Sequence, residues 1–313
     1  MVQAVSRSSR RVEIMTHDDA AVYLQAFLRE YEYPSEATET LSAGLKKLYA
    51  NAGEDFKVLI KAYAQNKYID FQALIKRAGE LAEKAELSPY TVYLLVFILL
   101  SKVCEAYYLA EGYARDIWRD NFFDLKYKAI ECRLVKGVWG TFVPEWFARF
   151  YQVERFTFGL LQFEIVNFDK RFEENVFHLT GEDKVINIHI PRTGNKLFPQ
   201  EVDRACTRAS AFFKEKFGFK RIIFQCESWL LFPKNKQLLK PDSNLYSFIS
   251  RFTIVGSGEF ENYNEVWRLF DCEYTGDIEK LPADTSFRRA YVDWMKKGEK
   301  TGWGYGIYPY SEE

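Results

Sequence analysis

Four polar side chains stand near the ends of two predicted strands, where they could take part in chemistry. Alternate side chains of a strand share a face, so Asn187 lies with His189, and on the neighbouring strand Cys226 lies with Ser228. Histidine titrates near neutral pH and suits a general base, and a cysteine can act as an acid or a nucleophile. The structural alternatives are a core histidine bonded to a carbonyl, a space-filling cysteine and a helix-capping serine.

A strand, a glycine loop, a helix and a second strand must position these side chains. Residues 185–190 alternate apolar and polar types and are rich in β-branched residues, which predicts a strand. A helical period runs from 199 to 217, Gly218 ends that helix, and a buried strand follows over 221–226. We therefore expect two parallel neighbouring strands with a right-handed connection, and open α/β sheets bind ligands at the carboxyl ends of such strands.

Further strands and helices are expected on both sides of this unit. Residues 155–167 predict one long strand, and residues 172–179 predict its hairpin partner. The later elements follow the second core strand in order: a helix over 228–239, a strand over 245–255, a glycine turn over 256–258, helices over 262–270 and 282–297, and an aromatic tail over 303–310 that could add a strand.

The first part of the chain is predicted to be a helical bundle. Apolar residues recur there at helical spacing behind capping residues, over 16–34, 35–53, 55–65, 70–86, 88–111 and 114–133. The apolar run at 90–100 is shorter than the ~18–20 residues needed to cross a bilayer, which favours a buried core helix. Gly137 and Gly140 mark a change in composition, so we expect a helical domain over 1–135 and a sheet domain over 136–313.

Composition argues against several classes of function. Lys and Arg number 43 against 44 Asp and Glu, and the net charge of −1 gives no field that would hold nucleic acid or an acidic membrane. Five cysteines without C-x-x-C spacing, and no secretory signal, indicate reduced thiols in the cytoplasm. Three unclustered histidines argue against a metal site, and P-loop, dinucleotide and serine-hydrolase motifs are absent. The 17% of aromatic residues favours aromatic packing over a hydrophobic ligand tunnel.

Several short segments, in a fixed order, resemble one bacterial protein family. The most specific is Cys226-Glu-Ser-Trp-Leu-Leu231 after a strand, and the others are 159–163, 187–191, Ser243-Asn244 leading to Arg251-Phe252, and Leu281-Pro282 with Thr285, Ser286 and Arg289. The chain is identified as a member of the acyltransferase-domain proteins, which join a helical N-acyltransferase N-terminal domain to a GNAT-like C-terminal domain. The resemblance implies an α+β fold: an N-terminal helical bundle followed by a GNAT-like mixed β-sheet flanked by helices.

The resemblance also implies that acetyl-CoA or another acyl-CoA is a co-substrate, bound between the two parted parallel strands. Its pyrophosphate would lie at the start of the crossover helix, where unpaired amides and the helix dipole favour anions. The residues in place to bind coenzyme A are Ile190, Arg192, Gly194, Asn195, Lys196, Ser228 and Asn244. GNAT enzymes usually show Q/R-x-x-G-x-G/A where this loop reads R-x-G-x-K, so a plain turn with two solvated cations is the alternative.

The implied catalytic residues are His189, Cys226, Glu164, Glu227 and Tyr246. Glu164 would act as a base through water, Tyr246 stands near the usual place of a general acid, and Glu227 replaces a histidine that is frequent in the family. Cys226 would protonate the leaving thiolate, or would carry the acyl group with His189 as its activator. We expect direct attack by the amine, because burial in a strand raises the pKa of a thiol.

The resulting hypothesis is an N-acyltransferase that moves an acyl group from acyl-CoA to an amine of a small molecule or peptide, without a metal. Neither a nucleic acid nor a membrane is an expected partner, and the sequence does not indicate an oligomeric state. The rival hypothesis is a non-catalytic GNAT-like module that binds a ligand or a protein, which the altered loop favours.

Overall fold

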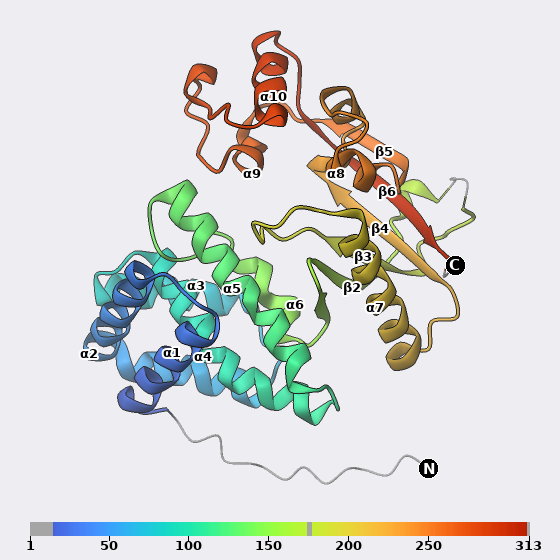
Figure 1. The fold of residues 1–313 in the computed structure, drawn as a ribbon. Helices are drawn as coiled ribbons and strands as arrows, with labels where there is room; N and C mark the ends of the chain where they lie inside the picture. The colour runs from blue at the N-terminus through green and yellow to red at the C-terminus, as the bar shows by residue number, and fades with distance from the viewer. Residues whose placement is uncertain (1–14, 174–176, 312–313) are drawn as a thin grey trace, which may run out of the picture. The chain divides into compact units, whose positions relative to one another are not determined.

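The computed structural model describes residues 15–173 and 177–311, and Figure 1 labels the α-helices and most of the strands. The chain divides into two compact units. The first holds residues up to 115 together with 138–152, and the second holds 116–137 and the chain from 153 onward. Helix α5 (Arg115–Lys136) therefore belongs almost entirely to the unit that contains the sheet.

The first unit is helical, as predicted. Its elements are α1 (His17–Glu30), α2 (Ser35–Gln65), α3 (Phe71–Ala85), α4 (Pro89–Ala110), the 3-10 turn η1 (Pro144–Phe147) and α6 (Ala148–Tyr151). The two helices predicted over 35–65 form one element, α2, with a kink at Ala52, where φ is −144°. Within the described part of the chain α4 alone is long and apolar enough to cross a membrane, but 61% of its apolar window is buried. It packs against α1, α2 and α3 as the predicted core helix.

The second unit is built on a mixed sheet, which confirms the predicted fold class. Its six strands in the described residues run in the order β1-β2-β3-β4-β6-β5. Their bounds are β1 Arg155–Phe158, β2 Leu161–Asn167, β3 Lys184–His189, β4 Ile222–Ser228, β5 Thr253–Glu259 and β6 Gly302–Tyr310. Strands β3 and β4 are parallel neighbours joined by the crossover helix α7 (Pro199–Phe217), as predicted, and every other pairing is antiparallel.

The long strand predicted over 155–167 is wrong, because the chain turns back on itself at Gly159. This glycine adopts φ +61°, a left-handed conformation that suits a tight hairpin. Strand β2 is then paired with β1 on one side and β3 on the other, which leaves no edge for the hairpin partner predicted over 172–179. Residues 170–172 form a 3-10 turn instead, and residues 174–176 lie outside the described part of the chain.

Three predictions after β4 are also wrong. The helix predicted over 228–239 is two 3-10 turns, η3 (Trp229–Leu231) and η4 (Pro233–Leu238), and the strand predicted over 245–255 begins instead as helix α8 (Asn244–Ile249). Gly256 and Gly258 lie inside β5 rather than in a turn. A Cβ at Gly256 would stand 2.2 Å from the ring of Phe172, so this glycine makes room for an aromatic side chain.

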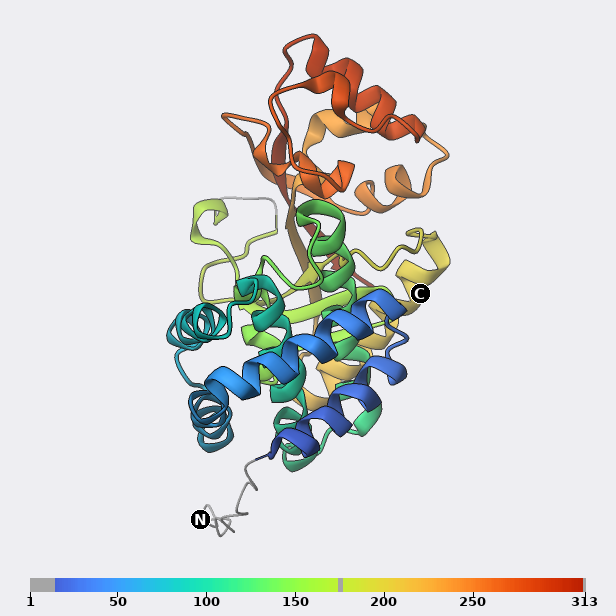
Figure 2. The ribbon, with the colours of Figure 1, turned by 90° about the vertical axis from the view of Figure 1, so that its left-hand side faces the viewer.

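The C-terminal elements complete the unit and cluster at one end of the sheet (Figure 2). They are η5 (Asn264–Val266), α9 (Trp267–Phe270), η6 (Ile278–Lys280) and α10 (Ser286–Lys296), which share one apolar cluster with residues of η3 and η4. The aromatic tail forms β6, as expected, and lies between β4 and β5.

Alternation along the strands gives the sheet two different faces. The aromatic face carries Phe156, Phe158, Phe163 and Phe224, and α7 covers it with Phe212 and Phe213. The polar face carries Arg155, Thr157, Gln162, Glu164, Asn187, His189 and Gln225. Helix α5 packs on the polar face at β1 and β2, where Asn121 bonds the backbone of Arg155 and Thr157.

Candidate active site

The two parallel strands separate at the carboxyl end of β3. Pairing of β3 with β4 joins Ile186 to Phe224 and Asn187 to Gln225 and goes no further in the described residues. Strand β4 stays paired with β6 as far as Ser228. His189 therefore stands at the place where the sheet opens between β3 and β4, which is where open sheets place ligands.

His189 is hydrogen-bonded to Glu164, which forms a buried ion pair with Arg155. Its Nε2 lies 2.7 Å from Oε1 of Glu164, and the other carboxylate oxygen accepts from Nε and Nη2 of Arg155 at 3.1 and 3.0 Å. Register explains the contact, since Arg155 is opposite Glu164 and Glu164 is opposite Asn187, two residues before His189 on the same face. The three side chains are thus held from three adjacent strands.

The surroundings of these three side chains favour a neutral His189 hydrogen-bonded to an ionised Glu164. Burial raises the pKa of Glu164, but the hydrogen bond from His189 and the charge of Arg155 outweigh it and bring the pKa to about 2. Burial lowers the pKa of His189, and the bond to Glu164 offsets this only in part. A carboxylate can only accept, so Nε2 carries the proton and the lone pair of the ring is on Nδ1. Nδ1 is therefore the basic nitrogen.

A row of amide and hydroxyl side chains continues from His189 across the polar face of the sheet. Nδ2 of Asn187 lies 2.9 Å from Nε2 of His189, and Oδ1 of Asn187 accepts from Nε2 of Gln225 at 3.3 Å. Nδ2 can only donate, so with the proton of His189 on Nε2 the first of these is a packing contact and not a hydrogen bond. The hydroxyl of Tyr305 donates to Oε1 of Gln225, and burial raises the pKa of Tyr305 to about 12, which keeps the proton on that hydroxyl. The polar face is thereby connected from β1 through β2, β3 and β4 to β6.

The structure separates Cys226 from His189. Gln225 is the register partner of Asn187 and bonds to it, so Gln225 lies on the polar face and Cys226 on the aromatic face. The Cys226 side chain is 1% exposed, and burial, followed by the charge of Glu227, raises the pKa of its thiol to about 12. The role of an acyl-carrying nucleophile activated by His189 does not fit this geometry.

Comparison with known proteins gives two family matches that cover most of the chain. Residues 22–153 match the N-acyltransferase N-terminal domain, and residues 156–308 match the GNAT-like C-terminal domain. The chain belongs to the family that joins these two domains. The resemblance drawn from the sequence is thereby confirmed, and the site described above lies in the GNAT-like domain.

Solved structures show the same fold at low sequence identity. An acyltransferase in complex with decanoyl-CoA and teicoplanin is 18% identical with a TM-score of 0.72, over 96% of this chain and 90% of that chain. An acyltransferase mutant in complex with octanoyl-CoA is 17% identical with a TM-score of 0.70, over 97% of this chain and 91% of that chain. No curated protein matches the chain.

The remaining predicted catalytic residues of the GNAT-like domain lie apart from the His189 chain of contacts. Glu227 is on the polar face opposite Tyr305, is exposed, and stands 3.8 Å from Arg171. Tyr246 is in α8, where Lys236 lies over its ring at 5.5 Å. Asn244 begins the same helix. Ser228 caps η3 by accepting from the amide of Leu230 at 3.1 Å, as the capping alternative had it.

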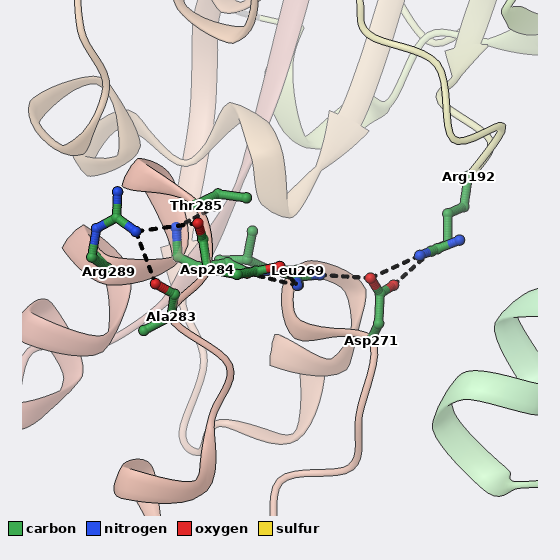
Figure 3. Close-up of polar contacts among 8 residues, drawn as sticks. Arg192, Leu269, Asp271, Ala283, Asp284, Thr285 and Arg289 are labelled. Atoms are coloured by element: carbon green, nitrogen blue, oxygen red, sulfur yellow. Dashed lines mark hydrogen bonds and ion pairs between the residues drawn. The ribbon is translucent and has the colours of Figure 1, made fainter.

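The loop after β3 gives its arginine an unexpected partner (Figure 3). Nε and Nη2 of Arg192 bond to Asp271 at 2.6 and 2.8 Å, and Asp271 also accepts from Arg288 at 2.6 Å. Arg192 is therefore bound to the residue that ends α9. The other predicted loop residues are Ile190, Gly194 at φ +80°, Asn195, whose amide bonds to Thr193, and Lys196, which is exposed.

Residues of the family-like segment near 285 also have structural partners. The side chain of Thr285 caps α10 by accepting from Arg288, and Arg289 donates to the carbonyls of Ala283 and Asp284 at 3.0 and 3.2 Å, as Figure 3 shows. These contacts fix the start of α10. Arg288, three residues after the capping Thr285, lies in the first turn of the helix and donates to Asp271.

Sequence reasoning missed Arg155 and Asp124, and it placed Gln162 on the same face as Glu164 without giving it a role. Polar residues at alternate positions, Arg155 with Thr157 and Gln162 with Glu164, were a signal that one strand face is polar. Asp124 comes from α5, where its carboxylate accepts from Nε2 of Gln162 at 2.9 Å, and a contact between distant segments leaves no local pattern. Among the described residues no group of three or more His, Cys, Asp and Glu side chains is placed to hold a metal ion.

Proposed function

We propose that the chain is an acyl-CoA-dependent N-acyltransferase in which His189 is the general base. The observation that carries the proposal is the His189–Glu164 pair at 2.7 Å, set where β3 and β4 part in a GNAT-like domain. A neutral histidine whose Nε2 is held by a carboxylate offers Nδ1 as the nitrogen that can take up a proton from the amine.

The proposed reaction is direct transfer without an acyl-enzyme. The neutral amine attacks the thioester carbonyl carbon, a C–N bond forms, and a proton of the amine passes to Nδ1 of His189. The C–S bond then breaks, and the coenzyme A thiolate leaves and takes up a proton, so that His189 returns to its neutral state. Glu164 stabilises the imidazolium in between, and Arg155 keeps Glu164 ionised.

Acyl-CoA would lie in the opening between β3 and β4, with its pyrophosphate near the loop before α7. Ile190, Gly194, Asn195, Lys196, Ser228 and Asn244 remain the proposed contacts to coenzyme A. Related structures hold octanoyl-CoA and decanoyl-CoA, and one holds teicoplanin, so we include medium-chain donors and amine-bearing small molecules among the substrates proposed here. The five cysteines are free thiols, which supports the proposed cytoplasmic location.

The proposal is tested by binding and by turnover on the whole chain. Calorimetry with coenzyme A, acetyl-CoA, octanoyl-CoA and decanoyl-CoA measures donor binding, and thiol release with a panel of primary amines measures transfer. We expect binding of at least one donor, and amine-dependent thiol release that His189→Ala abolishes. Binding without any amine-dependent release would favour the non-catalytic module, and no binding of any donor would overturn the proposed acyltransferase.

A further inference from the structure

Gln162 holds a buried polar atom beside the proposed base. It lies on β2 as the register partner of His189, on the same face, and is 1% exposed. Its Nε2 donates to Oδ1 of Asp124 at 2.9 Å. Its Oε1, however, is buried without a hydrogen-bond partner among the residues that the structure describes. A buried acceptor of this kind is uncommon in native proteins, because leaving it unpaired costs free energy.

The orientation of the Gln162 amide is set from α5. A carboxylate accepts hydrogen bonds, so the NH₂ group of Gln162 faces Asp124 and the carbonyl oxygen faces the other way. Asp124 is itself 1% exposed and belongs to a helix that Asn121 ties to the backbone of β1. The direction of Oε1 is therefore built into the fold before any substrate binds.

We propose that Oε1 of Gln162 accepts a hydrogen bond from the attacking amine, which makes the site selective for primary amines. This deepens the proposed N-acyltransferase function and rests on it. A neutral primary amine has two N–H groups: one proton goes to Nδ1 of His189, and the other N–H is donated to Gln162. A secondary amine has a single N–H and an alcohol a single O–H. Because that one hydrogen faces Nδ1 of His189, either acceptor leaves Oε1 of Gln162 without a hydrogen-bond donor.

A neighbouring residue supplies the matched control. Thr157 is the register partner of Gln162 on β1, and its Oγ1 is likewise buried without a partner in the described residues. A buried water bridging Thr157 to Gln162 would satisfy both atoms without any substrate. Under that alternative Thr157→Val and Gln162→Met would act alike, whereas our proposal assigns selectivity to Gln162 alone.

The test compares methoxyamine with N,O-dimethylhydroxylamine as acceptors, because both are small, both are neutral near neutral pH, and neither has an O–H group. Methoxyamine has two N–H groups and N,O-dimethylhydroxylamine has one. With octanoyl-CoA as donor, thiol release above the uncatalysed rate gives kcat/KM for each probe. We expect the wild type to prefer methoxyamine by about tenfold to a hundredfold, the cost of one unpaired buried acceptor. Gln162→Met should reduce the preference to about threefold or less with the KM for octanoyl-CoA unchanged, and Thr157→Val should keep it.

Each outcome decides one point. A preference that survives in Gln162→Met overturns the inference and leaves the acyltransferase intact. If Gln162→Met does not fold, Asp124→Asn replaces it, because an amide there allows Gln162 to turn over, and an unchanged preference in that variant overturns the inference equally. Equal rates with both probes in the wild type also overturn it. Absence of transfer to these and to every amine of the panel counts against the proposed function itself.

Discussion

The two faces of the sheet are made by the same strands but differ in function: one packs apolar side chains, and the other holds buried polar groups. On the aromatic face the rings of Phe163, Phe224 and Phe156 pack in a continuous layer under α7, and a thiol placed there has its pKa raised to about 12. On the polar face buried groups are joined in a line from Arg155 to Tyr305, and the pKa of a carboxyl group falls to about 2. Neighbouring residues of one strand therefore differ completely in chemistry.

The difference shows why a protein keeps a costly buried network. Replacing buried ion pairs by apolar side chains is often neutral or stabilising, so the polar face is poorly explained by stability. The aromatic face provides the packing that holds β3 and β4 in register. That packing allows the polar face to hold His189 in one tautomer at the opening between the strands. Exchanging one residue on each face separates the two roles.

The largest expected effect is loss of turnover on the polar face. His189→Ala should lower kcat by about 10²–10⁴-fold, because proton abstraction from the amine loses its base. Cys226→Ala, on the aromatic face, should keep kcat within about threefold, since its thiol stays protonated and distant from Nδ1. Steady-state kinetics on the two variants checks this. A loss of turnover in Cys226→Ala comparable to that in His189→Ala would contradict the assignment of faces.

The second effect is loss of stability on the aromatic face. Phe224 is fully buried between Phe163, Tyr308 and Tyr310, so Phe224→Ala should cost about 3–5 kcal/mol of unfolding free energy. Turnover per folded molecule should change far less than in His189→Ala. Urea denaturation, with kinetics on the folded fraction, measures both quantities. A small loss of stability would mean that the aromatic layer repacks easily.

Part of this arrangement followed from the sequence. Alternation placed Asn187 with His189, and their contact at 2.9 Å confirms it; the parallel pairing of β3 with β4 was also predicted. Which residue of β4 joins them depends on register, and a shift by one residue would have exchanged Cys226 for Gln225. Register is set by packing across the whole sheet and leaves no local pattern in β4.

Some of the other features could be recognised from a local sequence pattern, and some could not. Gly159 with φ +61° marks the hairpin that divides the predicted long strand, and a glycine between two apolar runs was a visible turn signal. Gly256 and Gly258 gave the same signal with a different cause, since the rings of Phe172 and Trp303 fill the space in front of them. Asp124 and Arg192 found their partners across 38 and 79 residues of sequence, which no periodicity encodes.

The third effect depends on pH. The folded pKa of Glu164 is about 2 against an ordinary 4.5, so its contribution to stability is present above pH 4.5 and is lost as the pH falls through 2. Glu164→Gln should therefore be less stable than the wild type by about 3 kcal/mol above pH 4.5, with the difference shrinking toward pH 2. Urea unfolding of both proteins across this range measures it. A difference that does not vary with pH would show that packing alone, without charge, is lost.

The same variant sharpens the role of Glu164 in turnover. Without the carboxylate the proton of His189 is no longer held on Nε2, so kcat should fall by about tenfold or more while the KM for acyl-CoA stays constant. A purely structural role would lower the amount of folded protein and leave kcat per folded molecule and its pH profile unchanged. Glu164→Asp, which keeps the charge on a shorter side chain, should recover part of the loss.

The smallest effects are expected at the loop before α7. They show whether Arg192 forms only a structural salt bridge or also contacts a phosphate group of coenzyme A. Arg192 is held by Asp271, which Arg288 also binds, so Arg192→Ala should lower stability by about 1 kcal/mol and change the Kd for coenzyme A by about twofold at most. Exposed Lys196 can approach the pyrophosphate, and Lys196→Ala should raise that Kd by about threefold.

Asp271→Asn decides between the two roles of Arg192. If the Arg192–Asp271 pair is only a structural salt bridge, the variant is less stable and binds coenzyme A no more tightly than the wild type. If the carboxylate competes with a phosphate group for Arg192, the variant binds coenzyme A more tightly, and Arg192 then returns to the residues that contact coenzyme A.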